Sequence, residues 1–308
     1  MATLEVTACS QWYGNVVAVN DVTVRIGPGV TGLLGPNGAG KSTLIHLLAG
    51  FLAPSAGTVT LDGAAIWKNT QVYRVLGLVP EREATFDYLT GRQLVVAAAE
   101  LHGLRDAGAA AQRALTTVAM HEAQDRRVGE YSKGMKQRVK MAAALVHDPQ
   151  VLLLDEPFNG MDPRQRLHLI ALLRTMGDEG RTVLFSSHIL EEVEQLATHV
   201  EVLVAGRHAA SGDYREIRRL MTDRPHQYTI VSSDNRALAA ALIADRSTAG
   251  VGLETQSLRV QATEFVPFAE LLPRVAQAAG VRLYEVTPMD ESLESVFAYL
   301  VQPRGARP

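Results

Sequence analysis

The sequence predicts an α/β domain followed by a small α+β domain. Two observations predict the first domain. An apolar strand over residues 30–34 enters a glycine-rich loop and then a helix, and a second apolar strand over 151–154 ends in two carboxylates. The order strand, helix, strand, strand, helix, strand after residue 226 is typical of a ferredoxin-like fold. We place the domains at residues 1–222 and 226–302, before a disordered tail at 303–308.

Composition excludes several classes of protein. Of the 308 residues, 47% are hydrophobic and 20% are charged, as is ordinary for a folded chain. The formal net charge of −3 argues against a nucleic-acid partner, which usually requires a positive excess. We expect no signal peptide and no transmembrane segment, because no stretch approaches the roughly 20 apolar residues that span a bilayer. The single cysteine, Cys9, excludes an internal disulfide and fits a reducing compartment.

The elements of the first domain follow from periodicity and turn signals. Apolar residues alternate over 4–8 and again over 22–26, which predicts two strands before a Gly-Pro-Gly turn at 27–29. The helix after the glycine-rich loop should end at Gly50. Thr90 and Gln93 fit a capping box that opens a helix to about residue 102. Further elements are expected as helices at 107–120, from 133 and at 163–176, a strand at 182–186, and a hairpin at 200–211.

The second domain shows the same kinds of signal. Its expected elements are strands at 228–231, 251–255, 258–262 and 282–286, with helices at 236–244, 267–278 and 293–300. It carries neither a glycine-rich phosphate loop nor an acidic pair at a strand end. We therefore expect it to support regulation or dimer formation and to carry no part of a nucleotide site.

The glycine-rich loop has the spacing of a phosphate-binding P-loop, Gly35-xxxx-Gly40-Lys41-Ser42. Glycines let backbone N–H groups turn inward, and the following helix adds its positive end. Lys41 would bring a point charge to the β- and γ-phosphates, and the Ser42 hydroxyl would contact Mg²⁺. The predicted ATP contacts are Gly35, Pro36, Asn37, Gly38, Ala39, Gly40, Lys41, Ser42 and Thr43. A chance match is the alternative, but strand and helix flank the loop as a P-loop requires.

The acidic pair Asp155-Glu156 follows a strand that should be central in a parallel sheet. Ligands bind at the carboxyl ends of such strands. Asp155 is placed to hold Mg²⁺, and Glu156 is placed to polarise the attacking water. An apolar strand that happens to end in two acids is the alternative interpretation.

A third motif, Tyr131-Ser132-Lys133-Gly134-Met135, lies between these two and resembles the signature of ABC ATPases. Asn159 to Asp162 follow the acidic pair, and His188 follows the next strand, so residues 1–220 are similar to an ABC ATPase throughout. This resemblance implies an ABC-type P-loop ATPase with a RecA-like core, an antiparallel β subdomain and a helical subdomain over about 88–147.

The resemblance also implies roles for individual residues. Ser132, Lys133, Gly134 and Asp162 of one copy would close on the ATP held by a second copy. Tyr13 would stack on adenine, and His188 would reach the γ-phosphate. The alternatives are a plain helix cap for Ser132, a core aromatic or replacement by Trp12 for Tyr13, and a solvated loop residue for His188.

The sequence departs from the usual ABC pattern at several positions. Lys133 and Met135 replace a signature glycine and glutamine, and Asn159 and Met161 replace the usual serine and leucine. Glu81 stands where the family has the glutamine of the Q-loop. Glutamate offers an oxygen at nearly the same distance, so we predict Ser42, Asp155 and Glu81 as the Mg²⁺ ligands, with a solvent-facing Glu81 as the alternative.

Residues 79–81, 88–91, 132–135 and 290–297 resemble the bacterial ABC branch that exports drugs, antibiotics, lipids or polysaccharides. The branch implies an ATPase at the cytoplasmic face of the membrane that acts as a head-to-tail homodimer. A separate membrane permease would dock near residues 82–101, and dimer closure would drive it. The alternatives are an ABC ATPase that acts on ribosomes or DNA, and an ATP-binding regulator with little hydrolysis.

Overall fold

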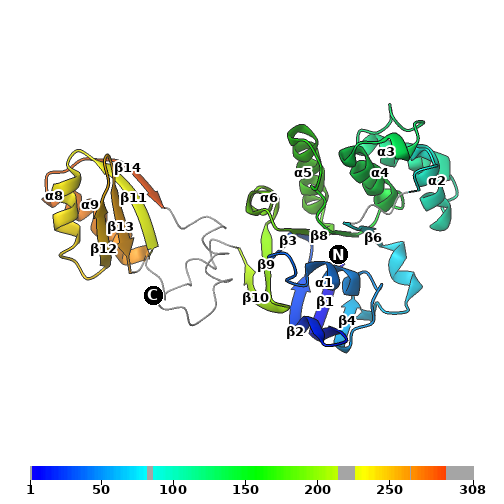
Figure 1. The fold of residues 1–308 in the computed structure, drawn as a ribbon, viewed down its shortest axis with the longest axis horizontal. Coiled ribbons are helices and arrows are strands. Elements are labelled where there is room, and N and C mark those ends of the chain that lie inside the picture. The colour runs from blue at the N-terminus through cyan, green and yellow to red at the C-terminus, as the bar shows by residue number, and fades with distance from the viewer. Residues whose placement is uncertain (1, 82–85, 214–225, 264, 289–308) are drawn as a thin grey trace. The chain divides into compact units, whose positions relative to one another are not determined.

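The computed structural model describes residues 2–81, 86–213, 226–263 and 265–288. The chain forms two compact units, Met1–Ser211 and Gly212–Pro308, and each is described by itself (Figure 1). Three predicted segments lie outside the described residues: the junction at 222–225, the helix at 293–300 and the tail at 303–308.

A six-stranded sheet forms the centre of the first unit, in the order β10-β9-β3-β8-β7-β6. Its strands are β3 (Gly29–Leu34), β6 (Leu76–Val79), β7 (Val151–Leu154), β8 (Thr182–Ser187), β9 (His199–Val204) and β10 (Arg207–Gly212). From β9 to β6 the neighbouring strands are parallel. All four residues of β7 are buried, as the apolar run predicts for a central strand. The carboxyl ends of β3, β7 and β8 therefore meet at one edge.

Helices and a second sheet cover the two faces of this sheet. Helices α5 (Pro163–Asp178) and α6 (Leu190–Leu196) lie on one face, and α1 (Lys41–Leu48) lies on the other with the antiparallel sheet β2-β1-β4-β5 (Figure 1). The strands of that sheet are β1 (Leu4–Tyr13), β2 (Val16–Ile26), β4 (Ala56–Leu61) and β5 (Ala64–Ala65). The alternation predicted through Ala8 is wrong, because Ala8 is exposed at a bulge with a φ of 46°.

The predicted helical region contains α2 (Gly91–Leu101), α3 (Ala107–Thr117) and α4 (Lys133–Leu145). A short 3₁₀ turn, η1 (Thr70–Arg74), precedes this region, and another, η2 (Val128–Glu130), lies within it between α3 and α4. The capping box is present: Thr90 accepts from the Gln93 amide at 3.2 Å, and the Gln93 side chain accepts from the Thr90 amide at 2.9 Å. Helix α3 ends three residues earlier than expected because Ala119 adopts a left-handed conformation.

The second unit has the predicted ferredoxin-like order. Its strands β11 (His226–Ser232), β12 (Thr248–Leu253), β13 (Leu258–Ala262) and β14 (Leu283–Pro288) pair antiparallel in the order β12-β13-β11-β14. Helices α8 (Asn235–Leu242) and α9 (Phe265–Ala278) complete it. Ile230, Leu238, Val260 and Phe268 are fully or nearly fully buried in one core. All the described residues of this core lie in the second unit.

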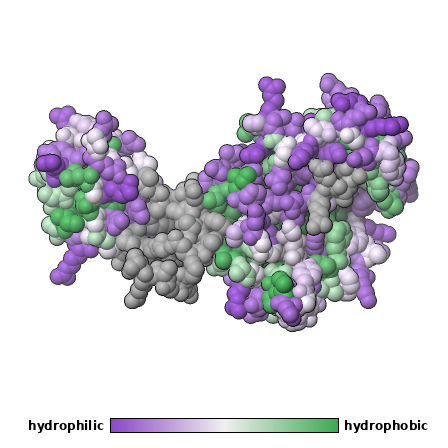
Figure 2. Space-filling view, in the orientation of Figure 1, coloured by the Kyte–Doolittle hydropathy of each residue, from purple (hydrophilic) through white to green (hydrophobic). Residues whose placement is uncertain are grey.

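Figure 2 shows that hydrophilic residues cover most of the visible face of the first unit. Among the helices in the described parts of the chain, none combines the length and the apolar character needed to cross a bilayer.

Candidate active site

The loop between β3 and α1 depends on glycine at two positions. Gly40 has a φ of 99°, and a Cβ atom there would lie 2.2 Å from the Ala18 carbonyl oxygen. At Gly35 a Cβ atom would lie 2.4 Å from the Leu203 carbonyl oxygen. Neither position has room for a side chain. The two glycines therefore let the loop pack against neighbouring backbone while it opens toward a cavity on its other side.

Lys41, the first residue of α1, is only 6% exposed. Its ammonium group donates to the Gly35 carbonyl at 2.8 Å and lies 3.6 Å from Oε1 of Glu156. A buried ammonium must be paired with acceptors, and these groups supply them. The ammonium thus has two oxygen acceptors, and both Lys41 and Glu156 line the cavity that the loop surrounds.

Asp155 and Glu156 follow β7 and are held by Ser186 on the neighbouring strand β8. The Ser186 hydroxyl donates to Oδ1 of Asp155 at 2.6 Å and accepts from the Glu156 amide at 2.8 Å. Parallel pairing of Leu154 with Phe185 places this serine beside both acids. The sequence analysis missed Ser186. The available signal was a polar residue at the end of a strand expected to run beside the acidic strand.

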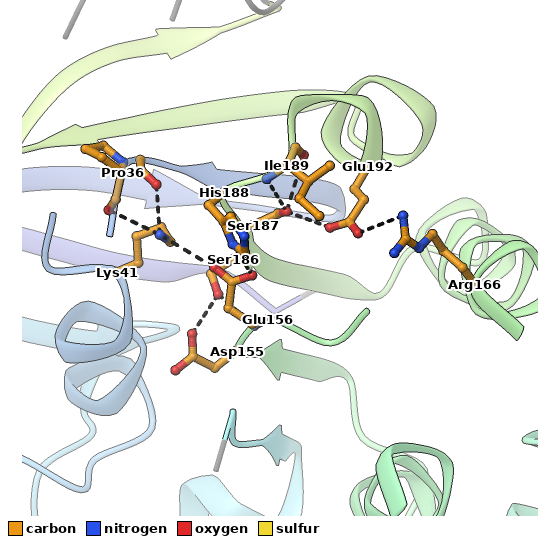
Figure 3. A network of polar contacts seen from close by, with 11 residues as sticks. Pro36, Lys41, Asp155, Glu156, Arg166, Ser186, Ser187, His188, Ile189 and Glu192 are labelled. Carbon is orange, nitrogen blue, oxygen red and sulfur yellow. Dashed lines mark hydrogen bonds and ion pairs between the residues drawn. The ribbon is translucent and has the colours of Figure 1, made fainter. Parts of the chain in front are cut away.

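Glu156 lies between the two other predicted catalytic residues (Figure 3). Its Oε2 is 2.8 Å from Nδ1 of His188, and its Oε1 is the oxygen near Lys41. The Glu156 side chain is 8% exposed, whereas that of His188 is 40% exposed. The structure thus joins the predicted residues of three separate motifs through the buried carboxylate of Glu156. His188 is exposed on its loop, as the alternative interpretation expected, and it also contacts Glu156.

A cavity of about 440 Å³ opens at this point. Its lining includes the predicted loop residues from Asn37 to Thr43 together with Glu81 and Glu156. Glu81 is solvent-exposed, as the alternative interpretation expected, and it also faces this cavity. The cavity therefore brings a carboxylate from the Q-loop position to the P-loop and to Glu156.

The predicted Mg²⁺ ligands Ser42, Asp155 and Glu81 offer only oxygen, the donor that this hard cation prefers. Within the described part of the chain, no three His, Cys, Asp or Glu side chains are arranged to hold a metal unaided. Mg²⁺ usually keeps waters and uses substrate phosphates as ligands, so a partial set of protein oxygens fits it.

The residues of the signature lie elsewhere in the monomer. Ser132 caps α4 by accepting from the Met135 amide at 3.2 Å, and Asp162 caps α5 by accepting from the Gln165 amide at 2.9 Å. Ser132, Lys133, Gly134 and Asp162 are not among the described residues that line the cavity at Lys41. Lys133 packs on Gly160, where an added Cβ atom would lie 2.9 Å from the lysine Cβ.

Tyr13 and Trp12 are each 47% exposed, so the alternative interpretation of Tyr13 as a core aromatic is wrong. They pair with Val16 and Val17 of β2, which line the cavity at the P-loop. An aromatic ring is therefore available on the strand next to the cavity.

Lys140 is a further residue that the sequence analysis missed. It is 7% exposed, and its ammonium donates to the carbonyls of Pro80 at 2.8 Å and Glu81 at 3.4 Å. It thereby fixes the backbone that presents Glu81. A single lysine in the third turn of a helix gives no sequence signal for such a contact.

Known proteins resemble this chain over most or all of its length. The profile of the ABC transporter family matches residues 19–159. The daunorubicin resistance ATP-binding protein DrrA3 of Streptomyces coeruleorubidus is 32% identical over 303 residues, which cover 96% of this chain and 95% of that protein. The linearmycin resistance ATP-binding protein LnrL of Bacillus subtilis is 32% identical, with 94% of each chain covered. A solved ATP-binding subunit of an ABC transporter is 30% identical, with a TM-score of 0.64 and coverage of 70% and 92%.

Proposed function

Because this chain belongs to the family of ABC transporter ATP-binding subunits, we propose that two copies of it hydrolyse Mg²⁺·ATP as a head-to-tail dimer that drives an export permease. The observation that carries the proposal is the position of Glu156 between Lys41 and His188 at the edge of the P-loop cavity. A carboxylate with these two partners can orient a water against a phosphate held by the loop.

Binding begins with an exchange of partners at Lys41. The phosphates of ATP take the position that the Gly35 carbonyl and Glu156 now share on the ammonium. The loop N–H groups and the start of α1 add further donors. Ser42, Asp155 and Glu81 hold Mg²⁺, which when bound neutralises phosphate charge. Tyr13 stacks on the adenine, a contact worth about 1–3 kcal/mol in comparable base–ring pairs.

The same exchange prepares Glu156 for its chemical role. Once Lys41 turns to the phosphates, one Glu156 oxygen is free to accept a hydrogen bond from the attacking water. His188 and the amide hydrogen bond to Ser186 keep the carboxylate in place. The water oxygen attacks the γ-phosphorus, the bond to the β-phosphate oxygen breaks, and Glu156 accepts the water proton.

A second copy is needed because Ser132, Lys133, Gly134 and Asp162 do not line the monomer's own cavity among the described residues. Ser132 begins a helix of 13 residues, and a helix N-terminus attracts anions. In a head-to-tail dimer this helix start closes on the γ-phosphate in the partner's P-loop. Each ATP then lies between the P-loop of one copy and the signature of the other.

Of the predicted docking region 82–101, residues 82–85 lie outside the described residues, and the surface from residue 86 onward suits a protein partner. Phe86 and Tyr88 are 56% and 70% exposed and contact each other edge to face. Exposed aromatic pairs are characteristic of interfaces. A groove of about 320 Å³ nearby is lined by Phe51 and by Leu94 of α2. The occupant is a cytoplasmic segment of the permease, which holds the chain at the inner membrane face. The relatives named for daunorubicin and linearmycin resistance support export as the direction of transport.

The test is Mg²⁺-dependent ATP turnover by the purified chain and by Glu156→Gln. We expect kcat to fall about 10²- to 10³-fold while the affinity for ATP is kept, since only the proton acceptor is lost. Glu122→Gln, at a surface position, is the matched control and should not change kcat. Near-normal turnover in Glu156→Gln would remove Glu156 from this role.

A further inference from the structure

A further buried carboxylate, Glu192 of α6, lies beside the loop that contains His188 (Figure 3). The residue is 4% exposed. Its Oε2 accepts from the Ser187 hydroxyl at 2.6 Å, and its Oε1 lies 3.4 Å from a guanidinium nitrogen of Arg166. The ion pair lacks hydrogen-bond geometry, so the bond to Ser187 is the directed contact of this carboxylate.

The Ser187 hydroxyl holds the chain on both sides of His188. It donates to Glu192, and it accepts from the Ile189 amide at 2.9 Å. Since residues 187 and 189 flank His188, this oxygen limits the path of the loop from which the imidazole reaches Glu156. Loss of the Glu192 acceptor would let the hydroxyl turn to the Ile189 carbonyl oxygen, 3.3 Å away, and would weaken its bond with the Ile189 amide.

Arg166 connects this arrangement to residues 159–162, the segment between the acidic pair and α5 that is called the D-loop in ABC ATPases. It lies in the first turn of α5, the helix that Asp162 caps, and its backbone amide donates to the Asp162 carbonyl at 3.0 Å. Glu192 therefore has the His188 loop on one side and the start of α5 on the other. In the proposed dimer, Asp162 lies at the contact between copies.

Burial raises the pKa of the Glu192 carboxyl, whereas the Ser187 hydrogen bond and Arg166 lower it. A carboxylate in this position is costly unless both partners stay in place. If Glu192 only joined α6 to α5 through Arg166, it would not need its hydrogen bond to Ser187, the neighbour of His188. That hydrogen bond therefore favours a role in positioning His188 over a role in helix packing alone.

We propose that Glu192 is a positioning residue. Through Ser187 it orients His188 toward Glu156, and through Arg166 it couples the position of His188 to that of the D-loop. The inference rests on the proposed function of Glu156 and His188. Glu192 touches neither nucleotide nor water in this role, and its effect on hydrolysis passes through the backbone of residues 187–189.

The test uses the purified full-length chain and a cycle of Ser187→Ala, Glu192→Ala and the double variant. Misplacing a reacting group by about 1 Å can cost up to about 100-fold in rate, so each single variant should lose about 10-fold or more in kcat with little change in KM. The double variant should be no slower than the slower single, because the two residues act in series. Glu192→Gln keeps an acceptor for Ser187 and should restore much of the rate.

Glu191→Ala is the matched control, because Glu191 is the exposed neighbour on the same helix and carries the same charge. It should turn over like the parent chain. If the parent hydrolyses ATP and Glu156→Gln does not, but Ser187→Ala and Glu192→Ala keep full kcat, this inference fails while the proposed function stands. Multiplicative losses in the double variant would also overturn it. A parent without turnover, or an active Glu156→Gln, would instead defeat the proposed function.

A readout without turnover uses the nucleotide-free chain with ¹³C-labelled histidine. The His188 signal is identified among the nine histidines by its loss in His188→Ala. It should shift in Glu156→Gln and in Ser187→Ala, which leaves the buried ion pair intact, and it should not shift in Glu191→Ala. An unmoved His188 signal in Ser187→Ala would overturn the positioning role even if Glu192→Ala failed to fold.

Discussion

Glu156 has a φ of 48°, in the left-handed region that non-glycine residues seldom adopt. Such a conformation costs of order 1–3 kcal/mol and persists when the surroundings enforce it. Here the Ser186 hydroxyl holds the amide, and Lys41 and His188 hold the two carboxylate oxygens. The strained backbone turns the side chain out of the strand direction and toward the P-loop.

Glu81 should affect, through its carboxylate, how strongly ATP hydrolysis depends on Mg²⁺. It brings a further carboxylate to a cavity that already contains Glu156. Like charges in a confined site repel, and Mg²⁺ offsets that repulsion. We expect Glu81→Gln to keep substantial ATPase activity and to reach half-maximal rate at lower Mg²⁺. Glu81→Ala should damage hydrolysis more.

Titration of Mg²⁺ against the ATPase rate of the parent and both variants measures this effect. Three superimposable curves would mean that Glu81 has no contact with the metal site. Glu122→Gln is a useful control, since the Glu122 carboxylate is exposed and lies away from the cavity at the P-loop.

Sequence reasoning found the residues whose spacing along the chain is constrained. Lys41 follows its loop directly, and Glu156 ends an apolar strand, so local pattern was enough. Ser186, Lys140 and Glu192 act on residues from other parts of the fold. The partner of Ser186 is 31 positions away, and the two partners of Lys140 are 59 and 60 positions away. The two partners of Glu192 are 5 and 26 positions away. Apart from the contact of Glu192 with Ser187, these contacts join residues too far apart for a short-range pattern to encode. They depend on the register of β7 with β8 and on the packing of α4 and α6.

At the scale of elements, two histidines join α2 to the end of α4. The rings of His102 and His147 stack with centroids 3.7 Å apart, and His147 Nε2 lies 3.2 Å from the Leu76 carbonyl oxygen. Burial, and then the neighbouring His102, lower the pKa of His147 to about 4. Burial also lowers the pKa of His102. Both rings are therefore neutral at pH 7, which lets them stack without charge repulsion.

This stack should make the helical region sensitive to acid. The unfolded chain takes up a proton on His147 near pH 6.5, whereas the folded chain does so only near pH 4. Stability is therefore lost as the pH falls through this window, by about 1–2 kcal/mol after allowance for the partial exposure of the ring. His147→Gln, which has no proton to take up, should lose less stability between pH 7 and pH 5.

Urea unfolding of the parent and His147→Gln at both pH values measures the difference. His121→Gln, at an exposed histidine of the same region, is the control and should behave like the parent. Equal losses of stability in His147→Gln and the parent would contradict the assigned cause.

Element types were easier to predict than element ends. The period and the capping box were sufficient for α2. The end of α3 and the bulge depend on single residues with positive φ, Ala119 at 54° and Ala8 at 46°, which are alanines and not glycines. Alanine carries no signal for such a conformation, so these ends are set by tertiary packing.

In the molecule as a whole, the second unit has its own core. The relative DrrA3 aligns with 96% of this chain, so the similarity extends into that unit. We expect a shortened chain that ends at Arg224 to keep its affinity for ATP, because all the described residues that line the P-loop cavity belong to the first unit. Calorimetry with ATP measures the affinity, and circular dichroism verifies folding. Loss of binding in a folded shortened chain would give the second unit a part in the site.

The central claim is that ATP joins two copies through Ser132 of one and Lys41 of the other. Sedimentation of full-length Glu156→Gln with and without Mg²⁺·ATP tests it most directly, since slow hydrolysis preserves the closed state. We predict a species of twice the single-chain mass only with nucleotide, and its loss when Ser132→Arg is added, although ATP still binds. A Glu156→Gln chain that is saturated with ATP and sediments as a single copy would contradict the account.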